Sequence, residues 1–276
     1  MTAIVAVAAS AWTLADPGLL HGPPAMNGSA RGTAVVMLAV AIPVLAASMG
    51  RAHAGSAAAL VTWAGALLYI VYNSILFLFL TPFNSAFLLC VGMLGLSVWS
   101  VELLRTSVGM RALAGRFSPH APVRGVAVYV WIVVALNAGA WLGRIVPALS
   151  DIYPENLMLG TGVATNAIYV QDLALWLPLM AVSAYWLYRR EARGLVICSA
   201  VLAMWVIESI SISVDQWMGH VADPTATVVS PDLVDPFVLL AIIGLVPVWL
   251  MLRNMLPADE AVRAPKLPAT QAGRTG

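Results

Sequence analysis

Long runs of apolar residues, separated by short polar connections, leave few folds open to this chain. We read eight of them, at residues 1–15, 33–49, 57–80, 83–104, 125–146, 165–187, 194–217 and 237–252. About 20 apolar residues in a helix cross the hydrocarbon of a bilayer, and only helices or closed barrels satisfy their backbone there. Residues are 61% hydrophobic and 10% charged, against about 25% charged in soluble domains. The sequence therefore predicts an all-α, polytopic transmembrane bundle over residues 1–256, in a multi-pass protein of the cell (plasma) membrane with the lipid bilayer as its surroundings.

The first run is the shortest, and a second interpretation of it stays open. Fifteen residues rise roughly 22 Å as a helix, less than the ~30 Å of hydrocarbon. A cleaved signal peptide would leave seven helices. However, no basic residue precedes the run, and Asp16, Pro17 and Gly18 follow it where a cleavage site needs small residues. We therefore interpret residues 1–15 as a retained helix.

Basic residues predict the orientation, because Lys and Arg accumulate in short cytoplasmic loops. With a cytoplasmic N-terminus, twelve of the 14 basic residues fall on the cytoplasmic side. These are Arg51, Arg105, Arg111, Arg116, Arg124, Arg189, Arg190, Arg193, Arg253, Arg263, Lys266 and Arg274. Only Arg31 and Arg144 fall on the other side. Both termini are thus predicted to be cytoplasmic, and residues 257–276, with few bulky apolar side chains, to form a disordered tail.

Several chemistries lack support in the sequence. Lys266, in the tail, is the only lysine, so a retinal Schiff base within a helix is excluded. The four histidines fall in connections or at helix ends, and the two cysteines have no CxxC spacing, so no haem, metal or other cofactor is predicted. Nucleotide-binding, zinc-protease and serine-hydrolase motifs are absent. The net charge of +1 gives no support for nucleic-acid binding. An enzyme is not favoured, and an oligomer is left open.

The stretch "WVIESISISVDQWMGH" carries an acidic residue deep inside the seventh run. Glu208 lies about 14 residues from the inner end, roughly 21 Å, near the bilayer midplane. A charge there costs about 2.5–3.5 kcal/mol, so such residues face the bundle interior and often mark ion or substrate paths. Ser211 and Asp215 follow at helical spacing on the same face. This face is the first candidate site.

Polar residues of other runs are predicted to meet it. Asp172, on a face with Tyr169, lies at a depth similar to that of Glu208, and two close carboxylates favour a shared proton. Arg144, on a face with Asn137, is a candidate counter-ion for Asp172 or Asp215. The remaining candidates are Tyr69, Asn73 and, across a hairpin turn, Asn84.

Each candidate also has an interpretation in terms of packing alone, because amides and carboxyls in lipid stabilise helix contacts by about 1 kcal/mol. The stretch "GAWLG", residues 139–143, has the spacing of a GxxxG contact. In "TPFN", Thr81 is expected to cap a helix that begins at Pro82.

Two passages carry a resemblance. "YNSILFLFLTPFNSAFLLCVGMLGLS", residues 72–97, and "QDLALWLPLMAVSAYWLYRRE", residues 171–191, resemble stretches of a family of uncharacterised bacterial multi-pass membrane proteins. The resemblance covers about a sixth of the chain and implies no activity. It favours Asn73, Asn84 and Asp172 as positions to test.

Two functions remain. In the first, the polar interior transports a small solute together with a proton. In the second, the protein is a non-transporting membrane component (a sensor, a lipid-binding protein or an assembly partner) whose polar residues only fix helix packing. No internal repeat is evident along the sequence, which counts against a transporter. The glutamate at the midplane favours one, and we interpret the sequence as that of a proton-coupled transporter of unidentified substrate.

Overall fold

A computed structural model describes residues 1–150, 155–158 and 160–256. It is 79% helical, and the described residues form no strand beyond an isolated bridge between Phe117 and Met255, so the predicted all-α class is confirmed. The elements are α1 (Thr2–Ala15), α2 (Pro24–Val36), η1 (Met37–Ala41), α3 (Ile42–His53), α4 (Ala57–Phe79), α5 (Phe87–Ser107), α6 (Met110–Ala114), α7 (Val123–Ala148), α8 (Glu155–Met158), α9 (Ala167–Gln171), η2 (Asp172–Trp176), α10 (Leu177–Tyr188), α11 (Ala192–Ala222), η3 (Pro231–Leu233) and α12 (Val234–Arg253). The predicted tail, residues 257–276, lies outside the described residues.

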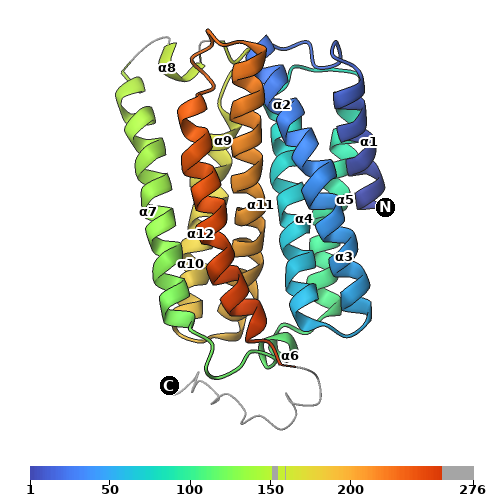
Figure 1. Ribbon diagram of the computed structural model, residues 1–276, viewed down its shortest axis with the longest axis vertical. Helices are drawn as coiled ribbons and strands as arrows, with labels where there is room; N and C mark the ends of the chain where they lie inside the picture. Colours follow the sequence, from blue (N-terminus) through green and yellow to red (C-terminus); the bar gives the residue numbers. More distant parts are fainter. Residues whose placement is uncertain (151–154, 159, 257–276) are drawn as a thin grey trace, which may run out of the picture.

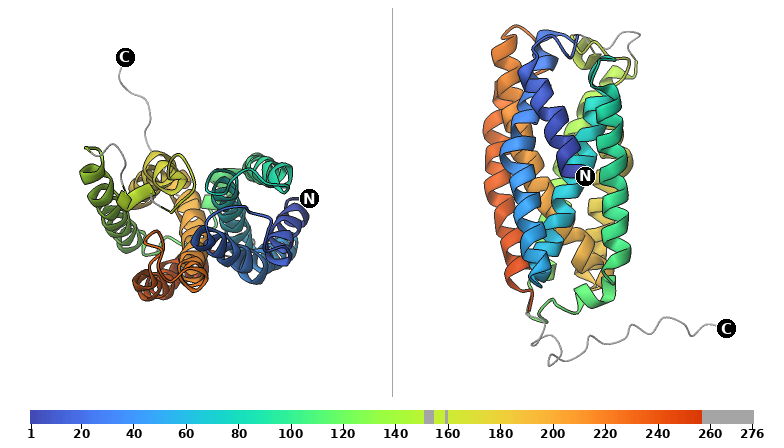
Figure 2. Two further views of the ribbon diagram at one scale, coloured as in Figure 1. Left: turned by 90° about the horizontal axis from the view of Figure 1, so that it is seen from above. Right: turned by 90° about the vertical axis from the view of Figure 1, so that its right-hand side faces the viewer.

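Seven helices of the described chain are long and apolar enough to cross a membrane. They run alternately up and down one bundle (Figure 1). The 14-residue α1 is shorter, and it begins about halfway along the bundle (Figure 2). A helix thus forms at residues 1–15, but its crossing of the membrane and the cytoplasmic N-terminus stay predictions. The architecture is compatible with a multi-pass integral membrane protein.

Three predicted boundaries are corrected. The second membrane helix begins at Pro24 rather than residue 33, because Gly28 and Gly32 let "PAMNGSARG" pack directly on α11 despite its polar composition. The fourth begins at Phe87, not residue 83. The Thr81 hydroxyl donates back to the Phe77 carbonyl, so the predicted cap at Thr81 is wrong. The last helix begins at Val234, a few residues earlier than predicted.

The central helix is α11, which contacts α2, α4, α10 and α12 and has almost every side chain of its apolar part buried. By contrast, α5, α7 and α12 expose large apolar side chains along their outer faces: Leu88, Trp99 and Leu103 on α5, Leu136 and Val146 on α7, and Leu239, Ile242 and Trp249 on α12. Contiguous apolar surface of this kind is costly in water and favourable in lipid.

Two of the descending helices contain a π-helical segment. η1 joins α2 to α3, and η2 joins α9 to α10; Pro43 and Pro178 follow within the next two residues. Proline cannot donate the backbone hydrogen bond of a regular helix, and π segments occur frequently at functional sites.

Basic residues gather at one end of the bundle, which we call the inner end and which holds the turns at 54–56, 108–122 and 189–191. Nine arginines lie in these turns or in the helical turns next to this end: Arg51, Arg105, Arg111, Arg116, Arg124, Arg189, Arg190, Arg193 and Arg253. Arg31, in α2, and Arg144, near the end of α7, lie in the halves of their membrane helices that are farther from the inner end. The described arginines therefore follow the predicted charge asymmetry, with the inner end predicted to be cytoplasmic.

Candidate functional site

Glu208 lies in the middle of the bundle, on the face of α11 that packs against α4. Its side chain is 2% exposed, and one carboxyl oxygen accepts a hydrogen bond of 2.8 Å from the side-chain amide of Asn73. That amide also donates to the Tyr69 carbonyl at 3.2 Å, while the Asn73 side-chain oxygen has no described partner. The partner of Glu208 is therefore an amide on α4 and not, as predicted, Asp172.

Tyr69, one turn nearer the inner end than Asn73 on α4, reaches Ser211, one turn nearer the outer end than Glu208 on α11. Its hydroxyl donates to the Ser211 hydroxyl at 3.0 Å, and both side chains are fully buried. The structure thus brings together four predicted residues, Tyr69, Asn73, Glu208 and Ser211, in one polar column between α4 and α11. We call this column the α4–α11 seam.

Asp172 is the first residue of the π segment η2 and is held from two sides. The Tyr72 hydroxyl donates to one carboxyl oxygen at 3.0 Å, and the indole N–H of Trp141 donates to the other at 2.8 Å. Tyr169 stacks against Trp141, with ring centroids 4.8 Å apart. Because Tyr72 and Asn73 are neighbours on α4, the two carboxyl groups are anchored to adjacent residues, but no hydrogen bond joins them directly.

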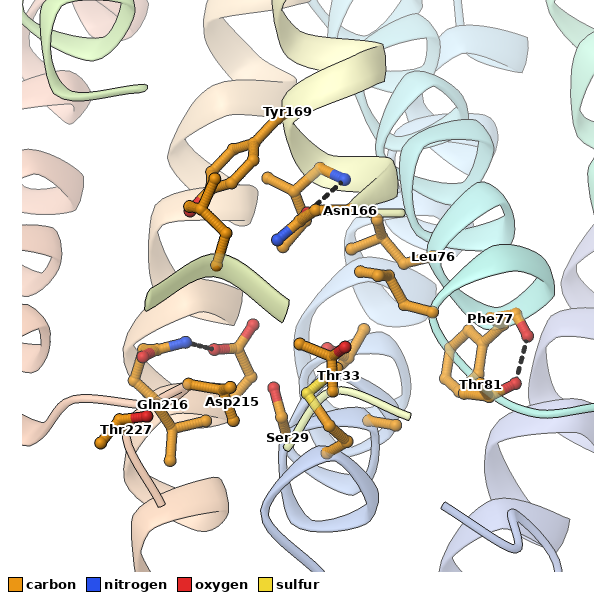
Figure 3. Close-up of a pocket in the computed structure, with 18 of the residues that line it drawn as sticks. Ser29, Thr33, Leu76, Phe77, Thr81, Asn166, Tyr169, Asp215, Gln216 and Thr227 are labelled. Atoms are coloured by element: carbon orange, nitrogen blue, oxygen red, sulfur yellow. Dashed lines mark hydrogen bonds between the residues drawn. The ribbon is translucent and has the colours of Figure 1, made fainter. Parts of the chain in front are cut away.

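A cavity of about 90 Å³ opens above the seam at the outer end. Asp215 borders it and accepts a hydrogen bond of 3.0 Å from Gln216 (Figure 3). Gln216 in turn accepts from the backbone N–H of Ser230. Four helices contribute polar side chains to the wall: Ser29 and Thr33 from α2, Arg144 from α7, Tyr169 from α9, and Asp215 and Gln216 from α11. The connections between helices add Thr81, Thr161, Asn166 and Thr227.

The inner half of the seam is closed by small residues. A Cβ atom placed on Gly65 would lie 2.7 Å from the Ala203 Cβ and 2.8 Å from the Ala200 carbonyl oxygen. Real Cβ atoms do not approach other atoms so closely, so α4 and α11 touch through their backbones at this level. The seam is therefore tightly packed towards its inner end, while the cavity lies beyond its outer end and is lined by none of its four residues.

Three predicted residues lie elsewhere or act differently. Asn84 organises the turn before α5, since its side chain donates to the Pro82 carbonyl and accepts from the Ala86 N–H, and it does not reach the seam. The side-chain oxygen of Asn137 is buried on α7 without a described partner. Arg144 borders the same cavity as Asp215, yet forms no ion pair with Asp215 or Asp172.

No cation balances the buried carboxyl groups within the described residues. The two ion pairs found there, Arg105–Glu102 and Arg193–Glu191, both lie near the inner end. Groups of three or more metal-binding side chains are also absent from the described part of the chain. An ionised Glu208 would therefore have no counter-ion among the described residues.

Sequence reasoning missed the donors to Asp172 and part of the cavity wall. Trp141 shares a helical face with Asn137 and Arg144, which could have marked it as a hydrogen-bond donor. Ser29 was missed because the polar start of α2 does not resemble a membrane helix. Thr33 is the first residue of the predicted second run and was not singled out as a candidate.

Fold and site together define a helical bundle with a buried polar seam and an outer cavity. Comparison of the chain with protein-family models, with curated proteins and with solved structures finds no match. The predicted resemblance to a bacterial membrane family stays a prediction.

Proposed function

We propose that this protein transports a small polar solute across the cell membrane together with a proton, along the α4–α11 seam. The observation that carries the proposal is Glu208, a carboxyl group that is buried at mid-helix without a described counter-ion. Ionisation there costs about 2.5–3.5 kcal/mol, whereas the protonated form is neutral. A carboxyl group that is buried in one state and reaches water in another can therefore bind and release a proton.

The size and lining of the outer cavity support the proposal that the transported solute is small. One water needs about 10–15 Å³ of such space, so about 90 Å³ accommodates several waters or a solute of a few heavy atoms. Asp215 and Arg144 place an acidic and a basic side chain in its wall, and Ser29, Thr33 and Asn166 add neutral donors and acceptors. We propose a polar solute that uses both donors and acceptors, entering at Asp215 and passing towards Ser211 and Glu208.

A packing role is the alternative, and one observation favours it. The hydrogen bonds Tyr69–Ser211, Tyr72–Asp172 and Asn73–Glu208 all join different helices, as expected for a membrane component whose polar groups only fix the fold. The two functions differ in whether Glu208 must titrate.

Glu208→Gln separates them, because glutamine still accepts the Asn73 hydrogen bond but cannot release a proton. The purified protein is reconstituted into liposomes that contain a pH-sensitive dye, and amino acids, polyols and small carboxylic acids are added one at a time. We expect at least one solute to drive proton flux through the parent protein, and Glu208→Gln to abolish it while leaving the Tm nearly unchanged.

Glu102→Gln is the matched control, since Glu102 is exposed near the inner end and paired with Arg105; its flux should equal that of the parent. If no solute drives proton flux through the parent, or if Glu208→Gln transports as the parent does, the packing role holds instead.

A further inference from the structure

The two interrupted helices are built alike. η1 and η2 each contain five residues, and each is followed by a proline at the second position of the next helix. Met37 and Asp172, which begin the segments, are 135 residues apart, and so are Pro43 and Pro178. Two interruptions of the same kind at the same spacing indicate a relation between two parts of the chain.

The same spacing continues through the following turn and helix. α3 ends at His53 and α10 at Tyr188, and the next helices begin after Ser56 and Glu191. Each turn has a residue with positive φ at the equivalent position, Gly55 at 90° and Arg190 at 55°. Residues 37–79 and 172–214 therefore align without a gap, at 135 residues throughout.

Side chains repeat as well. Twelve of the 43 aligned positions are identical, and they include V-x-x-S-I at residues 71–75 and 206–210. Ser48 and Ser183 each donate to the carbonyl three residues earlier. Ser74 and Ser209 each donate to the carbonyl four residues earlier. Equivalent residues thus make equivalent hydrogen bonds.

Helix order and direction extend the relation to both halves of the bundle. Each half has an ascending helix (α1 or α7), an interrupted descending helix (α2–α3 or α9–α10), an ascending central helix (α4 or α11) and a descending outer helix (α5 or α12) (Figure 1). α1 and α7 lie on opposite sides of the bundle (Figures 1 and 2). Each interrupted helix also contacts the central helix of the other half, α2 on α11 and α9 on α4.

Equivalent residues meet each other at the centre. Asn73 and Glu208, 135 residues apart, form the hydrogen bond of 2.8 Å. Gly65 and Ala200, also 135 apart, touch through their backbones. In a two-fold arrangement a residue contacts its own equivalent only at the axis. Both contacts therefore place such an axis along the α4–α11 seam, with α4 and α11 running in the same direction.

We infer that the chain contains two copies of one four-helix unit, residues 2–107 and 123–253, related by an approximate two-fold axis through the Asn73–Glu208 contact, and that the units rock against each other about this seam. The rocking rests on the proposed function; the duplication does not. Transporters built from parallel repeats bind their substrates near the bilayer midplane at the repeat interface, often beside interrupted helices. The Asn73–Glu208 contact has this position, and the outer cavity lies above it at the same interface, lined by α2, α4, α7, α9 and α11.

The two units differ in their chemistry. Asp172 begins η2, while the equivalent residue of η1 is Met37. The acidic residues Glu208 and Asp215 also belong to the second unit, and the first contributes Asn73 and Leu80 at those positions. The fold is thus nearly symmetric while the proposed site is not.

An exchange across the axis tests the duplication without any transport assay. Asn73→Glu alone places two carboxyl groups in contact, which is unfavourable, and should lower the Tm. The exchanged pair N73E/E208N keeps one amide and one carboxyl in contact between equivalent positions, and should recover most of the lost Tm. The matched control is Y72D/D172Y, an exchange between contacting residues that are not equivalent, which should recover nothing relative to Tyr72→Asp alone.

A cross-link provides a second readout. In a background without native cysteines (C90S/C198S), the pair G65C/A200C should form a disulfide across the inner seam. An N73E/E208N variant no more stable than Asn73→Glu would overturn the two-fold relation, and so would a G65C/A200C pair that folds with a cooperative unfolding transition and still does not cross-link. If both tests succeed, the cross-link should also abolish the solute-driven proton flux. Undiminished flux through the cross-linked protein would overturn the rocking while the duplication stands.

Discussion

Adding one methyl group to the inner seam is a direct test of how α4 and α11 pack. In Gly65→Ala the new Cβ would meet the Ala203 Cβ at 2.7 Å, the Ala200 carbonyl oxygen at 2.8 Å and the Met204 nitrogen at 3.1 Å. Ordinary contacts begin at 3.4 Å, so the two helices must separate by several tenths of an ångström. Overpacking of this kind costs about 1–3 kcal/mol, and the better helix propensity of alanine offsets up to about 1 kcal/mol.

With the middle of the overpacking range and the full gain in helix propensity, the net loss is about 1 kcal/mol, which lowers the Tm by roughly 2–4 °C. Thermal unfolding in detergent, followed by tryptophan fluorescence, measures it. Gly95→Ala is the control: Gly95 lies within α5 with nothing within 4 Å of an added Cβ, so its Tm should stay the same or rise. A Gly65→Ala protein as stable as Gly95→Ala would refute the close contact, and with it the closed inner half of the seam.

Two further stability predictions concern the buried carboxyl groups. Glu208→Ala removes the Glu208 acceptor of the Asn73 amide and should lower the free energy of unfolding by about 1–3 kcal/mol. The loss, measured by denaturation in detergent, should exceed that of Glu208→Gln. Equal losses would mean that the Asn73 contact contributes nothing. Tyr72→Phe and Trp141→Phe each remove one donor to Asp172 and should cost about 0.6–1.7 kcal/mol. Their double variant should show coupling, because both donors act on one carboxyl group, and strict additivity would contradict that arrangement.

Helix positions could be predicted from the sequence wherever apolar runs are long, because the hydrocarbon thickness sets the length of each run. The third, fifth, sixth and seventh runs agree with α4, α7, α9–α10 and α11 to within a few residues at most boundaries. The start of α2 could not be predicted in this way. This segment is polar in composition, and it packs in the bundle because Gly28 and Gly32 allow backbone contact with α11. Such a contact depends on a partner helix that the sequence does not identify.

Only part of the site could be predicted, because contacts between helices are again not specified by the sequence pattern. Spacing along a helix places Glu208, Ser211 and Asp215 on one face, as observed, because one helix determines that face. Pairings between helices depend on their lateral arrangement, so Asn73 could not be identified as the partner of Glu208. The spacing of "GAWLG" was equally insufficient, since a Cβ added to Gly139 or Gly143 would meet no atom of another described segment within 4 Å.

The proposed repeat could not be recognised from the sequence, because the residues identical in its two copies are mainly alanine, leucine, valine and serine, which are common in any membrane helix. The signals that reveal it are the π segments, the positive φ angles in the turns and the contacts between equivalent residues. All three depend on backbone geometry, which composition does not specify.

In this conformation the cavity lies on the outer side of the buried polar seam, and the inner half of the seam is closed. Cysteine labelling in sealed vesicles of known orientation, with a membrane-impermeant thiol reagent and the C90S/C198S background, tests this arrangement most directly. Ser29→Cys, in the cavity wall, should react from the outer side alone, and Ala203→Cys, in the closed inner half, should react from neither side. Labelling of Ala203→Cys from the inner side, or an unreactive Ser29→Cys, would contradict the account.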